Sequence, residues 1–184
     1  MIIAGLATAA AAGAVTTGTV PFVAALGGTT AAAEPGLAGT VASDALIPFA
    51  IASATAPVSG TLQVRVVRNS AGKLAFYWKI NNAPASKGSV ETFSVAGFPK
   101  QPYDANWRKD GLGTVAPSSV EGAFSAADLK SWILGFRFTT PIEPGRSSRF
   151  FFLRSGASKT VPAVAHVTGA GGASGDLAVS APAG

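Results

Sequence analysis

The residues that decide the fold are Ser59–Asn82, which read SGTLQVRVVRNSAGKLAFYWKINN. Apolar side chains recur at every second position on both sides of the turn NSAG: Leu62, Val64, Val66, Leu74, Phe76, Trp78 and Ile80. This period is typical of a β-strand with one buried face, because successive side chains of a strand point to opposite faces. Two such runs around a short turn with Asn and Gly predict a β-hairpin. Arg65, Tyr77 and Lys79 then face away from the core.

A second stretch, Ser131–Gly156, reads SWILGFRFTTPIEPGRSSRFFFLRSG and places an aromatic run on each side of a turn that bears arginines. Large apolar side chains are usually buried, so we expect these rings in the core between two sheets: Trp132, Phe136, Phe138, Phe150 and Phe152. The same parity leaves Arg137 and Arg149 outside the core, with Arg146 on the turn.

Weaker signals complete the prediction of the fold. Strands are predicted at residues 89–98, 162–169 and 175–182, the last two joined by the Gly-rich GAGGASG. Residues 101–119 carry Asp-Gly, Gly and Pro turn signals and are predicted as a long irregular connection. The run SAADLKSW is predicted as one helical turn with Ser125 as its N-cap. About seven to nine short strands are typical of an all-β, antiparallel β-sandwich, jelly-roll or immunoglobulin-like.

Length and composition indicate one domain that follows an apolar N-terminal segment. A chain of 184 residues fits one domain. Residues 1–33 contain no charged side chain, and Ala31 and Ala33 give the small-x-small pattern of a signal-peptidase site. We therefore predict an export signal at residues 1–33, cleaved near Ala33, or an apolar arm if it is retained. Residues 34–58 are a lead-in segment with a first strand, and residues 59–184 form the β-sandwich domain.

Several kinds of chemistry find no support in the sequence. The chain has no cysteine, which excludes disulfides, zinc-thiolate sites and a cysteine nucleophile. The chain has one histidine, His166, and no Gly-x-Ser-x-Gly motif that would present a nucleophilic serine to it. A Ser-His-Asp hydrolase is therefore not expected. Nothing pairs the carboxylates that glycoside hydrolysis needs among the candidates Glu91, Asp104, Asp110, Glu121, Asp128 and Glu143.

Metal and nucleic-acid binding are not expected either. The loop DANWRKDG is superficially similar to a calcium loop, with Asp104, Asn106 and Asp110, but Arg108 occupies the third ligand position and no Glu closes the loop. The net charge of +5 is spread along the chain without a block of like charges, so no nucleic-acid partner is expected. We expect no enzyme, no cofactor and no metal.

The order of several segments resembles a known group of proteins. These segments are Ser59–Asn82, FSVAGFP, WRKDGLGTVAPSSV, ILGFRFTTPIEPGRSSRFFFLRSGA and a late Gly-rich hairpin. The order resembles secreted bacterial β-sandwich proteins, many of which carry a C-terminal Pro-Glu-Pro sorting signal (the PEP-CTERM class). The resemblance covers roughly Ser59–Pro182. Its most specific parts are DGLGTVAPSS and the set Phe136, Phe138, Ile142, Pro144, Gly145, Ser147 and Ser148.

The resemblance implies export and residence at the cell surface or in the extracellular matrix, with no established chemistry. The chain ends in SAPAG, without the Pro-Glu-Pro motif. Covalent sorting is therefore not part of what the resemblance implies for this sequence.

Two groups of side chains are candidates for ligand binding. If their strands are neighbours, a basic stripe on one sheet is formed by Arg65, Arg137 and Arg149, with Arg146 on the adjoining turn. Arginine binds carboxylate, sulfate or phosphate through paired hydrogen bonds, but the same side chains also serve simply to solubilise a face of low charge. The second group consists of the aromatics Tyr77, Tyr103 and Trp107, which would stack on a sugar ring or, for the last two, cap the end of the sandwich.

The sequence thus predicts a secreted or cell-surface protein with a structural or adhesive, non-catalytic role. One alternative is a module that binds carbohydrate or an anionic polymer. Another is a self-assembling subunit of a layer, filament or shell, since low charge and open sheet edges permit self-association. The expected partners are extracellular polysaccharide or other surface proteins, and contact with a membrane is expected only through an uncleaved N-terminal segment.

Overall fold

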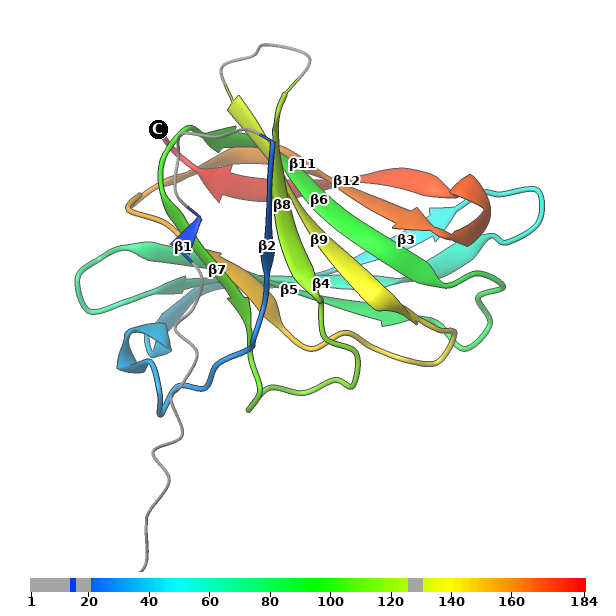
Figure 1. The fold of residues 1–184 in the computed structure, drawn as a ribbon, viewed down its shortest axis with the longest axis horizontal. Coiled ribbons are helices and arrows are strands. Elements are labelled where there is room, and N and C mark those ends of the chain that lie inside the picture. The colour runs from blue at the N-terminus through cyan, green and yellow to red at the C-terminus, as the bar shows by residue number, and fades with distance from the viewer. Residues whose placement is uncertain (1–13, 16–20, 126–130) are drawn as a thin grey trace, which may run out of the picture.

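A computed structural model describes residues 14–15, 21–125 and 131–184. They form two six-stranded antiparallel sheets that pack against each other (Figure 1). Sheet A has the order β1 (Ala14–Val15), β7 (Tyr103–Trp107), β10 (Phe151–Arg154), β5 (Leu74–Asn82), β4 (Val58–Arg68) and β3 (Thr40–Ile51). Sheet B has the order β12 (Ser174–Pro182), β11 (Thr160–Gly169), β6 (Val90–Pro99), β9 (Ser131–Ile142), β8 (Ser119–Phe124) and β2 (Phe22–Ala25).

The predicted all-β, antiparallel sandwich is confirmed. The described residues contain twelve strands, more than the sequence indicated, and two 3₁₀ turns, η1 (Pro35–Leu37) and η2 (Ala170–Gly172). No helix within the described ranges is long and apolar enough to cross a lipid bilayer. Part of the helical turn predicted at residues 125–132 lies outside the described residues, and Ser131 and Trp132 belong to β9.

The hairpin predicted at residues 59–82 is formed by β4 and β5, which place Val64 opposite Trp78. In its turn the side-chain oxygen of Asn69 accepts hydrogen bonds from the backbone N–H groups of Ala71 and Lys73, so the side chain stabilises the turn locally. The first strand expected within residues 34–58 is β3, which pairs along the length of β4. Residues 40–51 of this segment therefore belong to the same sheet as the hairpin.

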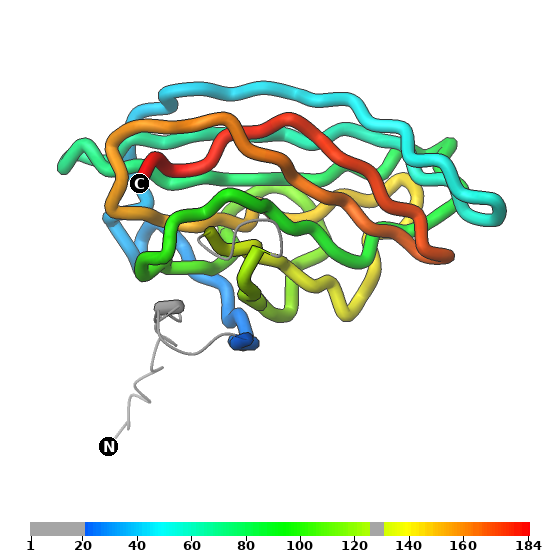
Figure 2. The backbone as a smooth tube through the Cα atoms, turned by 90° about the horizontal axis from the view of Figure 1, so that it is seen from above, coloured from blue at the N-terminus to red at the C-terminus, as the bar shows by residue number. Residues whose placement is uncertain are grey.

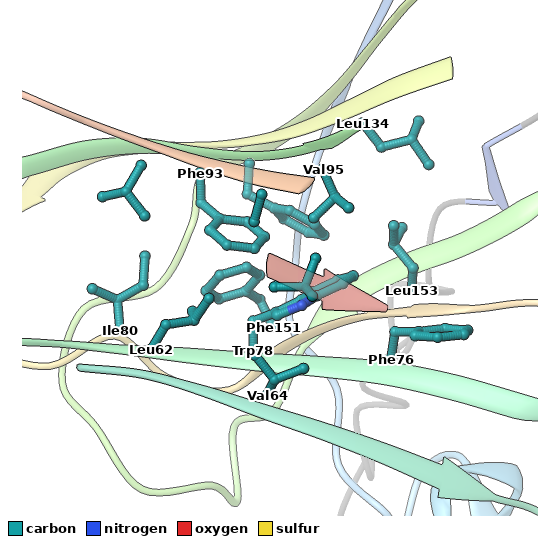
Figure 3. Packing of buried hydrophobic residues seen from close by; sticks show 14 of the residues in the cluster. Leu62, Val64, Phe76, Trp78, Ile80, Phe93, Val95, Leu134, Phe151 and Leu153 are labelled. Atoms are coloured by element: carbon teal, nitrogen blue, oxygen red, sulfur yellow. The ribbon is translucent and has the colours of Figure 1, made fainter. Parts of the chain in front are cut away.

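The core lies between the sheets, and the side chains predicted to face inward from the hairpin and from β9 are buried there. Trp78 lies near its centre, with ring centroids 5.3 Å from Phe93 and 6.0 Å from Phe151. Figure 3 shows Trp78 and Phe151, from sheet A, among side chains of sheet B such as Phe93 and Leu134. Tilted aromatic pairs of this kind contribute about 0.5–1.5 kcal/mol each beyond the apolar area that they bury.

The three consecutive phenylalanines at residues 150–152 correct one prediction. Phe151 and Leu153 face the core between the sheets, whereas Phe152 is buried on the outer face of sheet A and Phe150 is half-buried beside it. Three identical residues in a row have no alternation, so the sequence does not fix their parity. The outer face of sheet A is itself partly covered, which makes both faces of β10 apolar.

That cover is residues 28–39, which we call the strap. The backbone N–H of Thr29 donates to the carbonyl of Trp107, and the N–H of Lys109 donates to the carbonyl of Thr29. Glu34 forms an ion pair with Arg154, which also pairs with Asp104. Beyond Glu34, a second apolar cluster on the outer face is made by Leu37, Ala75, Tyr77 and Phe152.

The two sides of the sandwich are closed differently. On one side the edge strands β3 and β12 lie next to each other, cyan and red in Figure 2. On the other side the N-terminal segment supplies both edges, with β1 on β7 and β2 on β8. Residues 22–25 of the predicted export signal therefore lie in sheet B, while residues 1–13 and 16–20 are outside the described residues.

Candidate functional site

A groove of about 560 Å³ lies on the outer face of sheet A, between the strap and the loop that follows β7. The outward parity of β4 and β5 supplies its floor, which contains Gln63, Arg65, Val67 and Tyr77. The strap and the start of β3 line one side, and the loop after β7 lines the other with Arg108, Asp110 and Leu112. This volume is within the range of about 300–1,000 Å³ that small-ligand sites occupy.

The charged side chains that line the groove are Arg65, Arg108 and Asp110, and Arg65 is paired with Asp44 on the neighbouring strand β3. Arg65 donates to Asp44 from Nε at 3.1 Å and from Nη2 at 2.5 Å. Arg108 donates to both carboxylate oxygens of Asp110, at 2.6 and 2.9 Å. A guanidinium has five N–H donors, so two hydrogen bonds to a carboxylate leave donors for a ligand. Because each arginine has an acidic partner, the groove has little net charge.

The arginines also set the ionisation of these carboxyl groups. The hydrogen bond from Arg108 lowers the pKa of Asp110 to about 2. Asp110 also accepts the backbone N–H of Ala31 at 2.9 Å, which ties the strap to the loop after β7. The hydrogen bond from Arg65 likewise lowers the pKa of Asp44, which accepts a further hydrogen bond from Gln63 at 2.9 Å. Both carboxylates are therefore ionised near neutral pH.

Tyr77 is the aromatic residue at the floor of the groove, and only 4% of its surface is exposed. The hydroxyl oxygen is itself buried and lies near the guanidinium of Arg108. Burial raises the pKa of Tyr77, with Arg108 acting in the opposite direction, so the phenol remains neutral. Because this oxygen is buried, Tyr77 shapes the floor of the groove and does not offer its hydroxyl to a ligand.

The structure does not bring the predicted arginines together. Arg65 lies in the groove, whereas Arg137 is exposed on β9 of the other sheet. The predicted basic stripe on one sheet therefore does not form. Arg146 is exposed on a turn beside a separate shallow pocket. Arg149 donates to the carbonyls of Lys109 and Gly111, at 2.8 and 3.2 Å, and so positions the loop that forms one wall of the groove.

Tyr103 and Trp107 also depart from the prediction, because they belong to the strand β7 and not to an irregular connection. Tyr103 is 1% exposed, and its hydroxyl donates to the carbonyl of Pro99 at 2.8 Å. Trp107 is half-buried against the core, with Gly28 of the strap close against its ring. Tyr103 cannot offer its ring to a sugar. The alternation of β7 spans only five residues between turn signals and was overlooked for that reason.

The residues of the calcium-like loop have separate partners. Asp104 pairs with Arg154, Asp110 pairs with Arg108, and Asn106 is buried and accepts the backbone N–H of Gly28 at 2.8 Å. Within the part of the chain that the structure describes, no group of three or more His, Cys, Asp or Glu side chains is arranged to hold a metal ion.

Sequence reasoning missed Arg108 as a groove residue, and it considered Asp110 only in the calcium-like loop and among the carboxylates that glycoside hydrolysis would need. It did place Arg65 and Tyr77 together on the outward face of the hairpin, and that parity was the available signal. Nothing in the sequence pattern indicates that residues 28–39 and 108–112 return to cover the same face. The groove exists only because these two distant segments meet there.

Comparisons with protein-family models, with curated proteins and with solved structures found no match to this chain. The resemblance to the PEP-CTERM class remains a hypothesis. The function is therefore argued from the residues of the groove.

Proposed function

We propose that the protein is a non-catalytic, extracellular β-sandwich with an adhesive role, and that its groove binds a neutral, hydroxyl-rich ligand such as a polysaccharide chain. The observation that carries the proposal is the combination, in one groove, of two charge-compensated arginines with the apolar surface of Leu112 and Phe150. The extracellular location rests on the resemblance to secreted proteins, and the groove requires that residues 28–33 stay on the chain as part of the strap.

Charge compensation favours a neutral ligand over an anionic polymer. An anion that approached Arg65 or Arg108 would also approach the ionised carboxylates of Asp44 and Asp110, which repel it. A sugar hydroxyl avoids this conflict, because it can donate to a carboxylate and accept from a guanidinium.

Apolar surface in the groove suits the C–H faces of sugar rings. Leu112 is exposed in the loop after β7, and Phe150 lines the groove with the guanidinium carbon of Arg65 5.2 Å from its ring centroid. Binding sites of this kind combine apolar contact with a few placed polar groups, which fix the orientation of the ligand.

The test is binding of the full chain to a panel of neutral and anionic polysaccharides, with Arg65→Ala compared with Arg137→Ala. Both substitutions remove one arginine from a strand, but only Arg65 lines the groove. Loss of a charge-assisted hydrogen bond should weaken binding of a neutral polysaccharide by about tenfold or more in Arg65→Ala. Arg137→Ala should bind like the unaltered chain.

Leu112→Ala gives an independent reading, because it removes exposed apolar surface from one wall of the groove. We expect weaker binding without loss of stability, since Leu112 is 77% exposed. Two results would contradict the proposal: binding to no neutral polysaccharide, or equal losses in Arg65→Ala and Arg137→Ala. Retention on heparin that falls steeply with salt would instead favour an anionic polymer.

A further inference from the structure

The N-terminal strand β2 forms the edge of sheet B next to β8. The same contacts with β8 could be made by β2 of another copy of the chain. It pairs antiparallel with β8 over its four residues, from Phe22 opposite Gly122 to Ala25 opposite Ser119. The backbone N–H of Leu26 continues the ladder by donating to the carbonyl of Ser118 at 2.9 Å. Figure 1 shows β2 as a separate blue arrow beside β8.

The edge of β8 is shaped to receive this particular strand. The ring of Phe22 lies over Gly122, where an added Cβ would be only 2.2 Å from a ring carbon. The same ring lies against Trp132, with centroids 6.0 Å apart and planes inclined at 60°. Phe22, Ala24 and Leu26 pack against the core, whereas Val23 between them is 71% exposed. This socket therefore fixes both the register and the face of the incoming strand.

A glycine pair separates β2 from the strap. Gly28 has a φ of 70°, in the left-handed region that favours glycine, and Gly27 before it is exposed. From Gly28 onward the chain is anchored, because Asn106 accepts the N–H of Gly28 and Thr29 pairs with the backbone of residues 107 and 109. A rotation at Gly27 would thus release β2 while the strap and the groove stay in place.

We propose that the edge of β8 is a strand-acceptor site, and that residues 22–26 of a second copy of this chain occupy it in a reciprocal exchange of N-terminal arms. Addition of a strand to a sheet edge is a general mode of protein association. The occupant is a second copy because the socket around Gly122 already matches this sequence and register. Reciprocal exchange between identical chains gives a closed two-fold dimer, and its population rises with protein concentration.

The absence of native cysteine allows a direct test with the full chain. Val23 and Glu121 face each other in the register of β2 and β8, and directly opposed strand residues are close enough for a disulfide. A tagged Val23→Cys chain is mixed at high concentration with an untagged Glu121→Cys chain, warmed, returned to room temperature and oxidised. We expect a covalent dimer that contains one chain of each kind.

Two controls define the outcome. Val164→Cys replaces Glu121→Cys as a partner that is exposed on β11, away from β8, and it should give only background dimer. Diluting the mixture tenfold before the warming step should lower the specific dimer, because exchange between chains depends on protein concentration.

A third variant carries Val23→Cys and Glu121→Cys in one chain. A disulfide between them within that chain would confirm the register of β2 and β8. The proposal is overturned if the mixed chains give no more dimer than the Val164→Cys control, whether or not the double variant closes. An excess over the control that dilution before warming does not reduce would also overturn it, because the dimer would then not form by exchange between separate chains.

Discussion

Within one loop, Arg108 donates two hydrogen bonds to the carboxylate of Asp110. The same carboxylate accepts the backbone N–H of Ala31 and so also holds the strap. The carboxylate of Asp110 thus orients the guanidinium of Arg108 and also fixes the strap, which lines one side of the groove. Arg65 and Asp44 repeat the arrangement between two strands. At the residue scale, the acidic partners matter as much as the arginines, because they reduce the net charge of the groove and hold the guanidinium groups in place.

The low pKa of Asp110 gives a prediction for stability. Its value of about 2 in the folded chain lies below the ordinary 3.8, so folding favours the ionised carboxylate. The resulting stability is fully present above pH 3.8 and is lost as the pH falls through 2. The carboxylate is 35% exposed, so we expect a contribution of about 1 kcal/mol or less.

Denaturant unfolding of the unaltered chain and of Asp110→Asn between pH 6 and pH 2 measures this contribution. The difference in unfolding free energy between the two chains should shrink as the pH falls through this window. Glu143→Gln is the control, because it alters an exposed acidic residue outside the groove. A difference that stays constant down to pH 2 would show that Asp110 does not contribute through its charge.

At the element scale, the strap turns one face of sheet A into a partly covered surface. It contributes a single well-buried apolar side chain, Leu37, from the short turn η1, which begins at Pro35. Proline suits the first position of such a turn, because its φ is already near the helical value. Leu37 packs with Tyr77 and Phe152 and also lines the groove, so the strap couples stability to the shape of the site.

Leu37→Ala should therefore affect stability and binding together. We expect a loss of about 2 kcal/mol in unfolding free energy, at the low end for a buried leucine because the outer cluster is small. Binding of the polysaccharide should weaken, since one wall of the groove loses its support. Leu46→Ala is the matched control, because Leu46 is 65% exposed on the neighbouring strand β3. Equal effects of the two substitutions would exclude a structural role for the strap.

The elements also show how far the sequence could predict this fold. Alternation identified β4, β5 and β9 correctly, because each has one face toward the core and apolar residues at every second position. It could not resolve Phe150–Phe152, since both faces of β10 are covered. It overlooked β7, whose outward residue Asn106 is buried beneath the strap. The groove was only half foreseeable, because its second wall depends on contacts between residues 28–39 and 108–112.

At the scale of the whole molecule, the N-terminal segment closes one side of the sandwich and the contact between β3 and β12 closes the other. Open sheet edges promote unwanted pairing between chains. The edge strand β3 carries a register shift, Asp44 and Pro48, features that discourage pairing. The edge of β8 is instead covered by β2, so cleavage near Ala33, which stays a prediction, would remove that cover.

The position of the folded boundary can be tested with two shortened chains, one beginning at Pro21 and the other at Glu34. The first keeps β2, whereas the second loses the strand, the packing of Phe22, Ala24 and Leu26 against the core, and the hydrogen bond from Gly28 to Asn106. Loss of this apolar burial should lower the unfolding free energy of the second chain by about 3 kcal/mol or more relative to the first. Denaturant midpoints and slopes, measured side by side, give the difference.

If both chains unfold with the same midpoint and slope, residues 21–33 add nothing to the stability of the domain, and cleavage near Ala33 would leave it as stable as before. A large difference would mean that cleavage near Ala33 removes a segment that stabilises the folded domain.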